Sequence, residues 1–245
     1  MSILKIGLLI LMTIGEASAN ETIDLYIPDA TPLLKTEPGF RSPLIAPVEA
    51  ALELTKQYRK ISTLPWARAQ KTVSNGKNHL IAPLARTTAR EGKFIWVAPI
   101  AISLHAFFSL HDPVHTFSEA KARYKRIGVG LGTAQIEILL ARGFSRSQLV
   151  ELKLGDTPAQ LLAKYRIDAW FTEIAEGRHV WLDTIGQLGK LKVSQPLATT
   201  NLYLACSLDC SPALVKDLRE ALSKSLGDLD SLEKIKNYNS LDLPE

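Results

Sequence analysis

The sequence predicts an α/β protein with two lobes, and two observations carry this prediction. First, short apolar segments typical of strands alternate with helical segments of about ten residues, which is the pattern of mostly parallel sheets joined by helices. Second, this alternation occurs in two successive blocks, at 21–100 and 107–194, before a C-terminal helical segment. The composition agrees, because 46% apolar and 22% charged residues are ordinary values for a chain with a packed core.

The first block contains four expected strands and two expected helices. The alternating apolar segment Ile23–Ile27 predicts a strand, and the prolines and the glycine after it predict a loop over 29–42. The other expected elements are strands over 60–64, 80–84 and 94–97, a helix over 48–58 that could begin from Pro43 or Pro47, and a helix over 66–73 that Asn75-Gly76 ends.

The second block repeats the pattern. A strand over 126–130 runs into a glycine-containing turn and a helix over 134–142, which Gly143 closes. Its other expected elements are helices over 118–123 and 158–165 and strands over 149–154 and 167–171. After the block we expect a strand over 202–206 and helices over 212–224 and 230–238, the first of these helices capped by Ser211.

The first 19 residues have the three parts of a cleavable secretory signal peptide. Lys5 supplies a positive start, 6–14 is an apolar run too short to span a bilayer, and Ala17-Ser18-Ala19 is a small-x-small cleavage site. The alternative is a buried N-terminal helix. We therefore expect an exported, periplasmic protein whose mature chain begins at Asn20.

Charge and cysteine usage narrow the function classes. The net charge of +4 is spread along the chain without a basic block, which argues against nucleic-acid binding. Cys206 and Cys210 are close enough to form a disulfide in an oxidising compartment, the alternative being two free buried thiols. Their spacing is not that of a zinc site.

The sequence offers little support for catalysis. His105, His111 and His115 cluster without the spacing of a metal site, and a polar loop with surface histidines is the simpler interpretation. The chain lacks a nucleophile elbow and a Walker-type phosphate loop, and Gly128-x-Gly130-x-Gly132 lacks the last spacing of a dinucleotide fingerprint. We expect no catalytic residue, no metal site and no cofactor.

Binding of a small ion is better supported. Gly130–Thr133 lie between a strand and a helix, where free backbone N–H groups can hold a carboxylate or a phosphate, although a plain tight turn also needs glycine. Arg86 and Arg90 follow a strand, and a guanidinium group suits a carboxylate, although a solvated basic loop is equally consistent.

Further candidates stand at the ends of strands and helices. Glu173 lies just beyond the strand over 167–171, at the kind of strand end that holds ligands in α/β sheets. Trp66 and Trp170 could provide apolar or cation–π walls, or could belong to the core, where tryptophan is more often found.

The order and spacing of five segments resemble the family 3 bacterial extracellular solute-binding proteins, the amino-acid-binding type that serves ABC importers. The PWxRA element and the RTxxRE loop resemble a divergent branch of that family. The segments are LPWARAQ at 64–70, IAPLARTTAREGKFIWVAPI at 81–100, IGVGLGTAQIEILL at 127–140, YRIDAWFTE at 165–173 and LYLACSLDCSPALVKDLREAL at 202–222.

The resemblance implies a two-lobed periplasmic-binding-protein-like fold, each lobe a mixed, mostly parallel sheet with flanking helices, with the ligand clamped between the lobes. Lobe one would comprise 20–101 and 197–245, and lobe two 102–196, with hinge crossings near 101–104 and 195–199. The resemblance further implies that Arg90 pairs with a ligand α-carboxylate, that Gly132 and Thr133 donate to the same carboxylate, and that Glu173 binds an α-ammonium group.

The chain also departs from the family pattern. Pro83 and Ala85 stand where small hydroxyl residues are common, Glu173 replaces the commoner aspartate, and the stacking aromatic is either Tyr26 or Phe40. We expect a monomeric periplasmic protein that captures a small polar, amino-acid-like ligand by hinge closure and delivers it to a membrane permease. The alternatives are a periplasmic enzyme of the cyclohexadienyl dehydratase type and a ligand-sensing partner of a membrane signalling protein.

Overall fold

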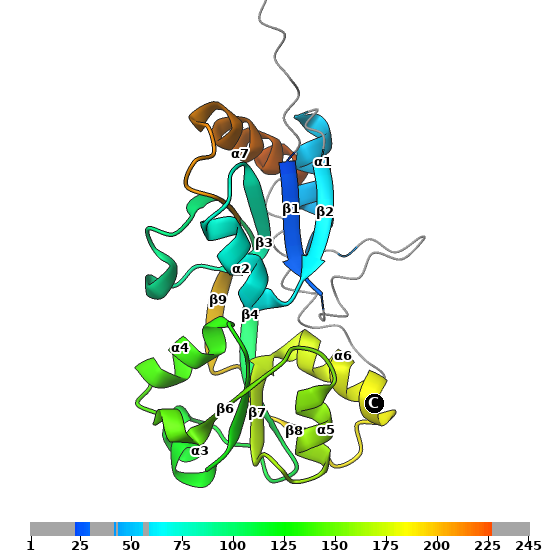
Figure 1. Cartoon of the computed structure of the whole chain (residues 1–245). Helices are drawn as coiled ribbons and strands as arrows, with labels where there is room; N and C mark the ends of the chain where they lie inside the picture. The colour runs from blue at the N-terminus through cyan, green and yellow to red at the C-terminus, as the bar shows by residue number, and fades with distance from the viewer. Residues whose placement is uncertain (1–22, 30–41, 43, 56–58, 227–245) are drawn as a thin grey trace, which may run out of the picture.

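The computed structural model describes residues 23–29, 42, 44–55 and 59–226 of the 245-residue chain (Figure 1). The expected signal peptide at 1–19, the loop residues 30–41 with the candidate Phe40, and the expected helix over 230–238 lie outside the described residues. Among the described residues, no helix is long and apolar enough to cross a membrane.

The strands pair into one continuous sheet whose two ends are parallel and whose middle is antiparallel. Its order is β2-β1-β3-β9-β4-β7-β5-β6, and the short β8 pairs with β4. Parallel pairing joins β1 to β2 and β3 at one end and β5 to β6 and β7 at the other, whereas β9 and β4 are antiparallel to their neighbours. The strands are β1 Ile23–Pro28, β2 Arg59–Leu64, β3 His79–Ala85, β4 Ile95–Ser109, β5 Ile127–Gly130, β6 Leu149–Leu152, β7 Ala169–Glu173, β8 Lys192–Val193 and β9 Ala198–Cys206.

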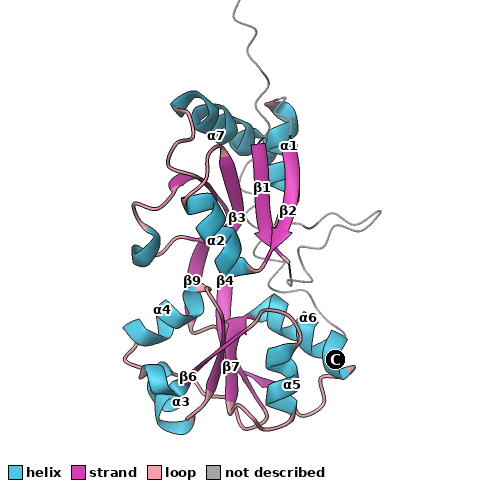
Figure 2. Ribbon diagram, viewed as in Figure 1, coloured by secondary structure: helices cyan, strands magenta, loops and turns pink. Residues whose placement is uncertain are grey.

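Seven helices flank the described part of this sheet, and they fall into two groups, one in each lobe (Figure 2). One lobe carries α1 Ala46–Leu54, α2 Trp66–Ser74 and α7 Pro212–Leu226, and the other carries α3 Phe117–Arg123, α4 Ala134–Ala141, α5 Thr157–Ala163 and α6 Ile174–Ile185. Each lobe has its own buried apolar clusters, one of them centred on Leu25 and Leu52 in the first lobe and another on Phe107 and Phe171 in the second. The predicted two-lobed α/β fold is therefore confirmed.

Strand β4 is the largest departure from the sequence prediction. The expected strand over 94–97 instead extends to Ser109, which gives a strand of 15 residues that runs from one lobe into the other. Pro99 would normally interrupt a strand, but the pairing with β9 shifts register between Pro99 and Ala101, and such an irregularity accommodates proline. The expected hinge crossing at 101–104 lies inside this strand, opposite Thr199–Leu202 of β9.

Helix α6 is the second departure, because the sequence interpretation placed no helix after the strand over 167–171. Gly177 lies inside the helix, where a Cβ would come within 2.5 Å of a ring carbon of the buried Phe108. The cap is also unusual, since Glu173 accepts hydrogen bonds from the N–H groups of Ala175 and Glu176 in place of the commoner serine, threonine, aspartate or asparagine. Both features weaken the local signal that normally marks a helix start.

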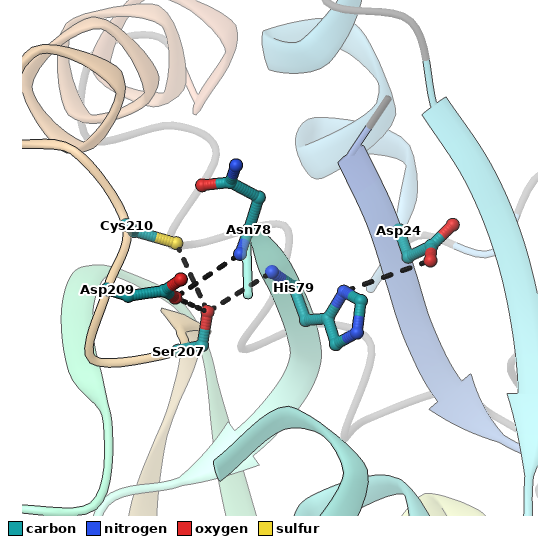
Figure 3. A network of polar contacts seen from close by, with 6 residues as sticks. All are labelled: Asp24, Asn78, His79, Ser207, Asp209 and Cys210. Atoms are coloured by element: carbon teal, nitrogen blue, oxygen red, sulfur yellow. Dashed lines mark hydrogen bonds and ion pairs between the residues drawn. The ribbon is translucent and has the colours of Figure 1, made fainter. Parts of the chain in front are cut away.

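A polar network ties the start of β3 to the turn between β9 and α7 (Figure 3). Ser207 Oγ accepts from the N–H of His79 at 3.2 Å and donates to Asp209 at 2.8 Å, and Asp209 also accepts from the N–H of Asn78. Cys206 and Cys210 are joined by a disulfide, which closes the same turn and confirms the expected pairing. This end of the first lobe is thus fixed by paired polar groups and a covalent link.

Candidate functional site

A cavity lies between the two lobes and takes its lining from both of them. Its volume is about 110 Å³, which is room for several water molecules or for the polar part of a small ligand. The first lobe contributes Pro28, Leu44, Trp66, Pro83, Ala85 and Arg90. The second contributes Thr133, Ala134, Gln135, Leu154, Glu173 and Glu176. The connecting strands β4 and β9 contribute Ile102, Ser103, His105, Thr200 and Leu202.

Arg90 is the cationic group of the cavity wall. It ends the short 3₁₀ helix Thr88–Arg90 that follows β3, and only 6% of the residue is exposed. Its Nη1 donates to the carbonyl of Ala85 at 2.6 Å, and its Nη2 donates to the carbonyl of Gly132 in the other lobe at 2.9 Å. Desolvation lowers the pKa of Arg90, and the negative charge of Glu137 opposes that shift.

The turn at Gly132 brings the backbones of the two lobes close together. Gly132 has a φ of +75°, and a Cβ at this position would lie 3.1 Å from the Cβ of Ala67 on α2. The Gly132 carbonyl also accepts from Gln70 Nε2 at 2.8 Å, in addition to the bond from Arg90. Glycine is therefore required here both by conformation and by the close approach of the other lobe.

Thr133 and Gln135 organise the start of α4. Thr133 is the N-cap, and its hydroxyl donates to the carbonyl of Gly130 at 2.8 Å and accepts from the N–H of Gln135 at 3.3 Å. The buried Gln135 side chain accepts from the N–H of Gly130 at 2.7 Å and donates to Thr172 at 3.2 Å. These bonds hold the βα turn rigid, with Thr133 and Gln135 both facing the cavity.

Two carboxylates face the cavity from the start of α6. Glu173 accepts from the N–H groups of Ala175 at 3.1 Å and Glu176 at 2.6 Å, which fixes its position as the helix cap. Burial raises the pKa of Glu173 to about 7, against the lowering effect of these two bonds. Burial and the negative charge of Glu173 together raise the pKa of Glu176 to about 8.

His105 lies opposite Glu173 in the pairing of β4 with β7, and 5% of it is exposed. Its Nε2 is 2.9 Å from the hydroxyl of Thr200 and 3.2 Å from that of Ser103. Its Nδ1 is buried and has no hydrogen-bond partner in the described part of the chain. Burial lowers the pKa of His105 to about 4, so the ring is neutral at pH 7.

Of the residues singled out from the sequence, the structure brings Arg90, Thr133, Glu173 and Trp66 to the cavity, with Gly132 at its edge. Arg86 instead points outward, forms an ion pair with Glu91 at 2.7 Å, and lies over the rings of Trp96 and Tyr203. Tyr26 packs edge-on against His79 and does not line the cavity. Trp170 belongs to the core of the second lobe.

The sequence interpretation missed several cavity residues: Ser103, His105, Gln135, Glu176 and Thr200. It assigned His105 to a polar loop with surface histidines, and this is wrong because His105 is buried in β4, although His111 and His115 are exposed. The i, i+3 spacing of Glu173 and Glu176 was the one available signal, and it would have required α6 to be recognised first.

Comparison with known proteins places the fold. No family profile matches the chain, and a search of curated sequences finds no similar protein. Among solved structures, a histidine kinase sensor domain with similarity to periplasmic binding proteins is similar at 16% identity and TM-score 0.74, over 88% of this chain and 94% of that one. The arginine-, lysine-, histidine-binding protein ArtJ from Geobacillus stearothermophilus is similar at 14% identity and TM-score 0.73, over 92% and 97%. An ABC uptake transporter substrate-binding protein from Streptococcus pneumoniae with bound histidine is similar at 15% identity and TM-score 0.71, over 89% and 92%. The chain therefore has the fold of periplasmic binding proteins.

Proposed function

We propose that the chain is a periplasmic solute-binding protein that captures a small, polar, amino-acid-like ligand between its lobes for an ABC transporter, without chemical conversion. The observation that carries this proposal is one cavity walled by both lobes, with a buried arginine on one side and two carboxylates on the other. A zwitterion has complementary charges at its two ends, so it suits a site whose opposite walls differ in sign.

Each charged group has a defined part in this proposal. Arg90 pairs with the ligand carboxylate, because a guanidinium group keeps donors free after giving one bond each to Ala85 and Gly132. Gly132 and Thr133 form the turn on the other side of that carboxylate. Glu173 accepts from the ligand ammonium, since a carboxylate has about four acceptor positions and the helix cap uses two of them.

Ligand capture works through closure of the two lobes. We assign 20–101 and 197–245 to lobe one and 102–196 to lobe two, with hinges where β4 and β9 cross near 101–104 and 195–199. A ligand that touches both walls binds the closed form more tightly than the open form, and so shifts the population toward closure. The closed form would then be recognised by a membrane permease.

The structural neighbours support this class of function, because one is described as the substrate-binding protein of an amino acid ABC transporter and another as an ABC uptake transporter substrate-binding protein with bound histidine. A sensor role is the second candidate, favoured by the similarity to a histidine kinase sensor domain. The fold and the cavity would be the same in both cases. Only the protein that recognises the closed form would differ, so a pull-down with the closed, ligand-bound chain would separate permease from kinase.

Isothermal titration calorimetry against a panel of amino acids and small carboxylates tests the proposal, using protein purified from the periplasm after expression of the full chain. We expect at least one ligand to bind and to be recovered unchanged by mass spectrometry. Arg90→Ala should weaken binding by about tenfold or more, because it removes a charge-assisted contact. The exposed Arg146→Ala is the matched control and should bind normally.

Three results would contradict the proposal. Failure of the whole panel to bind would remove the proposed function. Unchanged affinity in Arg90→Ala would remove the assigned anion site. Conversion of the bound ligand would favour the enzyme alternative.

A further inference from the structure

The charges that line the cavity do not balance. Among the described lining residues the ionisable groups are Arg90 on one side and Glu173, Glu176 and His105 on the other. His105 contributes no charge at neutral pH because its burial lowers its pKa to about 4. With both carboxylates ionised, the wall carries one positive and two negative charges.

A simple zwitterion would leave this imbalance in place. Its carboxylate would offset Arg90 and its ammonium group would offset Glu173, as proposed above. The half-buried Glu176 would then remain as a carboxylate next to the negative charge of Glu173, which is unfavourable unless the group is protonated or meets a cation.

Glu176 also lacks a partner of its own within the described chain. The backbone N–H of Glu176 bonds to Glu173, whereas no described side chain or backbone donor reaches the Glu176 carboxylate. Glu173, by contrast, is occupied by the cap of α6. The two acidic residues therefore have different structural roles, because only Glu173 caps the helix.

His105 is an independent sign that a polar group is missing from this side of the cavity. Its ring is 95% buried, as the 5% exposure implies, yet its Nδ1 has no hydrogen-bond partner among the described residues. Its Nε2 already lies between the hydroxyls of Ser103 and Thr200. Buried polar atoms of proteins are rarely left without a partner unless a water or ligand supplies one.

We propose that the cleft is selective for amino acids with a cationic side chain, whose second positive group pairs with Glu176. This inference rests on the proposed function, because it assumes that a ligand is clamped by Arg90 and Glu173. The second cation brings the charges of ligand and wall to zero and supplies donors to the unpartnered Glu176 carboxylate.

A competing arrangement predicts something different. If Glu176 is protonated, it can donate to a neutral polar side chain, and a neutral ligand would then be preferred. The raised pKa of about 8 for Glu176 makes the two arrangements distinguishable by proton release. A cationic ligand must expel the proton held there, whereas a neutral ligand leaves it in place.

Calorimetry with two matched pairs of amino acids tests the inference: L-arginine against L-citrulline, and L-lysine against L-norleucine. Within each pair the members are similar in length, and only the first member has a charged side chain. We expect the charged member of at least one pair to bind about tenfold or more tightly than its neutral partner. Titration in buffers of different ionisation enthalpy should show more proton release at pH 7 for the charged member than for its neutral partner, because both displace the proton of Glu173 and only the charged member displaces that of Glu176. The affinity of the charged member should rise more steeply between about pH 6 and pH 8.

The variant Glu176→Gln keeps the size of the side chain and removes its charge. It should lower the affinity for the preferred cationic probe by about tenfold and reduce its proton release to that of the neutral partner, which comes from Glu173, while the neutral partner should bind as it does to the original protein. Asp183→Asn, an exposed position on the same helix, is the matched control and should change neither quantity. Proton counting on the unmodified protein gives an answer even if Glu176→Gln does not fold.

The possible outcomes separate this inference from the proposed function. Binding of neutral or acidic panel members, with no preference for either charged probe, would overturn the inference and leave the proposed function standing. Equal affinity of Glu176→Gln and the original protein for the cationic probe would also overturn it. If nothing in the whole panel binds, both proposals fail.

Discussion

The two ends of strand β3 differ in how far the nearby polar groups have hydrogen-bond partners. At its start, the N–H of His79 enters a network in which Ser207 and Asp209 find partners over distances of 2.8 to 3.3 Å, while the His79 Nδ1 makes no hydrogen bond in the described chain and lies 3.8 Å from the carboxylate of Asp24 (Figure 3). At its end, Pro83 and Ala85 face a cavity in which Glu176 and the Nδ1 of His105 lack partners within the described chain.

This difference indicates that the groups at the start of β3 contribute to stability and those at its end to ligand binding. Paired polar groups stabilise the folded chain, because each partner would otherwise be buried without a hydrogen bond. Unpaired polar groups facing a cavity lower the stability of the ligand-free protein, and a ligand can recover that free energy. Substitutions at the start of β3 should therefore affect stability alone, and substitutions in the cavity should trade stability against affinity.

The largest expected effect is on the network. Ser207→Ala leaves the half-buried N–H of His79 without its partner, while the exposed Asp209 keeps the N–H of Asn78, so the free energy of unfolding should fall by about 1–3 kcal/mol. Ligand affinity should stay within about twofold of the original, because the site is at the other end of the strand. Urea unfolding and calorimetry measure the two quantities, with the exposed Ser223→Ala as the control. A large loss of affinity in Ser207→Ala would break the comparison.

The second expected effect is a pH-dependent gain in stability when the charge of Glu176 in the cavity is removed. The folded pKa of Glu176, about 8, lies above its ordinary value of 4.5, so the unfolded chain binds fewer protons between these values and stability falls as pH rises through that window. Glu176→Gln does not titrate. The ligand-free variant should therefore match the original protein near pH 5 and exceed its unfolding free energy at pH 8, with a gap that grows by up to about 1.4 kcal/mol per pH unit between these values.

The titration of His105 changes stability with pH in the opposite direction and provides a check on this interpretation. Its folded pKa of about 4 lies below the ordinary 6.5, so its contribution to stability is present above pH 6.5 and is lost as pH falls toward 4. Thermal unfolding of the Glu176→Gln variant between pH 4 and pH 9 should retain this acid limb, keep the fall in stability up to about pH 7 that the raised pKa of Glu173 causes, and lose the further fall up to about pH 8. If the fall between pH 7 and pH 8 were unchanged, the charge of Glu176 would not be its cause.

A smaller effect is expected where the lobes touch outside the cavity lining. Gln70→Leu removes one of the two side-chain donors to the Gly132 carbonyl, and the bond from Arg90 remains. The closed form should lose about 0.5–1.5 kcal/mol, which corresponds to a loss of affinity of roughly two- to tenfold. The ligand should dissociate faster, which surface plasmon resonance can measure. Gln160→Leu, on the exposed side of α5, should leave the rate unchanged.

The sequence predicts more of the fold than of the candidate site. Strand and helix alternation is a local signal, and it located most elements of both lobes to within a few residues. The sequence did not predict helix α6, because it contains Gly177. This glycine leaves room for the ring of Phe108 on another element, which no local pattern reveals. The sequence also missed Glu176, which lies on this helix, and the place of His105 opposite Glu173, which depends on the pairing of β4 with β7.

Arg86 and Arg90 also show, within a single loop, that the local sequence does not decide which side chain reaches the cavity. Arg86 and Arg90 are of one residue type, four positions apart, and the sequence assigned both to ligand binding. The structure turns Arg90 toward the other lobe and turns Arg86 onto Trp96 and Tyr203, and Tyr203 lies on a strand far along the chain. Which arginine faces the cavity is decided by tertiary neighbours rather than by the loop sequence.

The smallest expected effect follows from that orientation. Arg86→Ala removes an exposed ion pair with Glu91 and contacts with two aromatic rings, so the free energy of unfolding should fall only slightly. The affinity for any ligand that Arg90→Ala weakens should remain within about twofold, because Arg86 does not line the cavity. Parallel titrations of the two variants measure this contrast directly. If Arg86→Ala weakened binding as much as Arg90→Ala, the anion site would extend to the outer face of the loop, and the division between a stabilising end and a binding end of β3 would have to be redrawn.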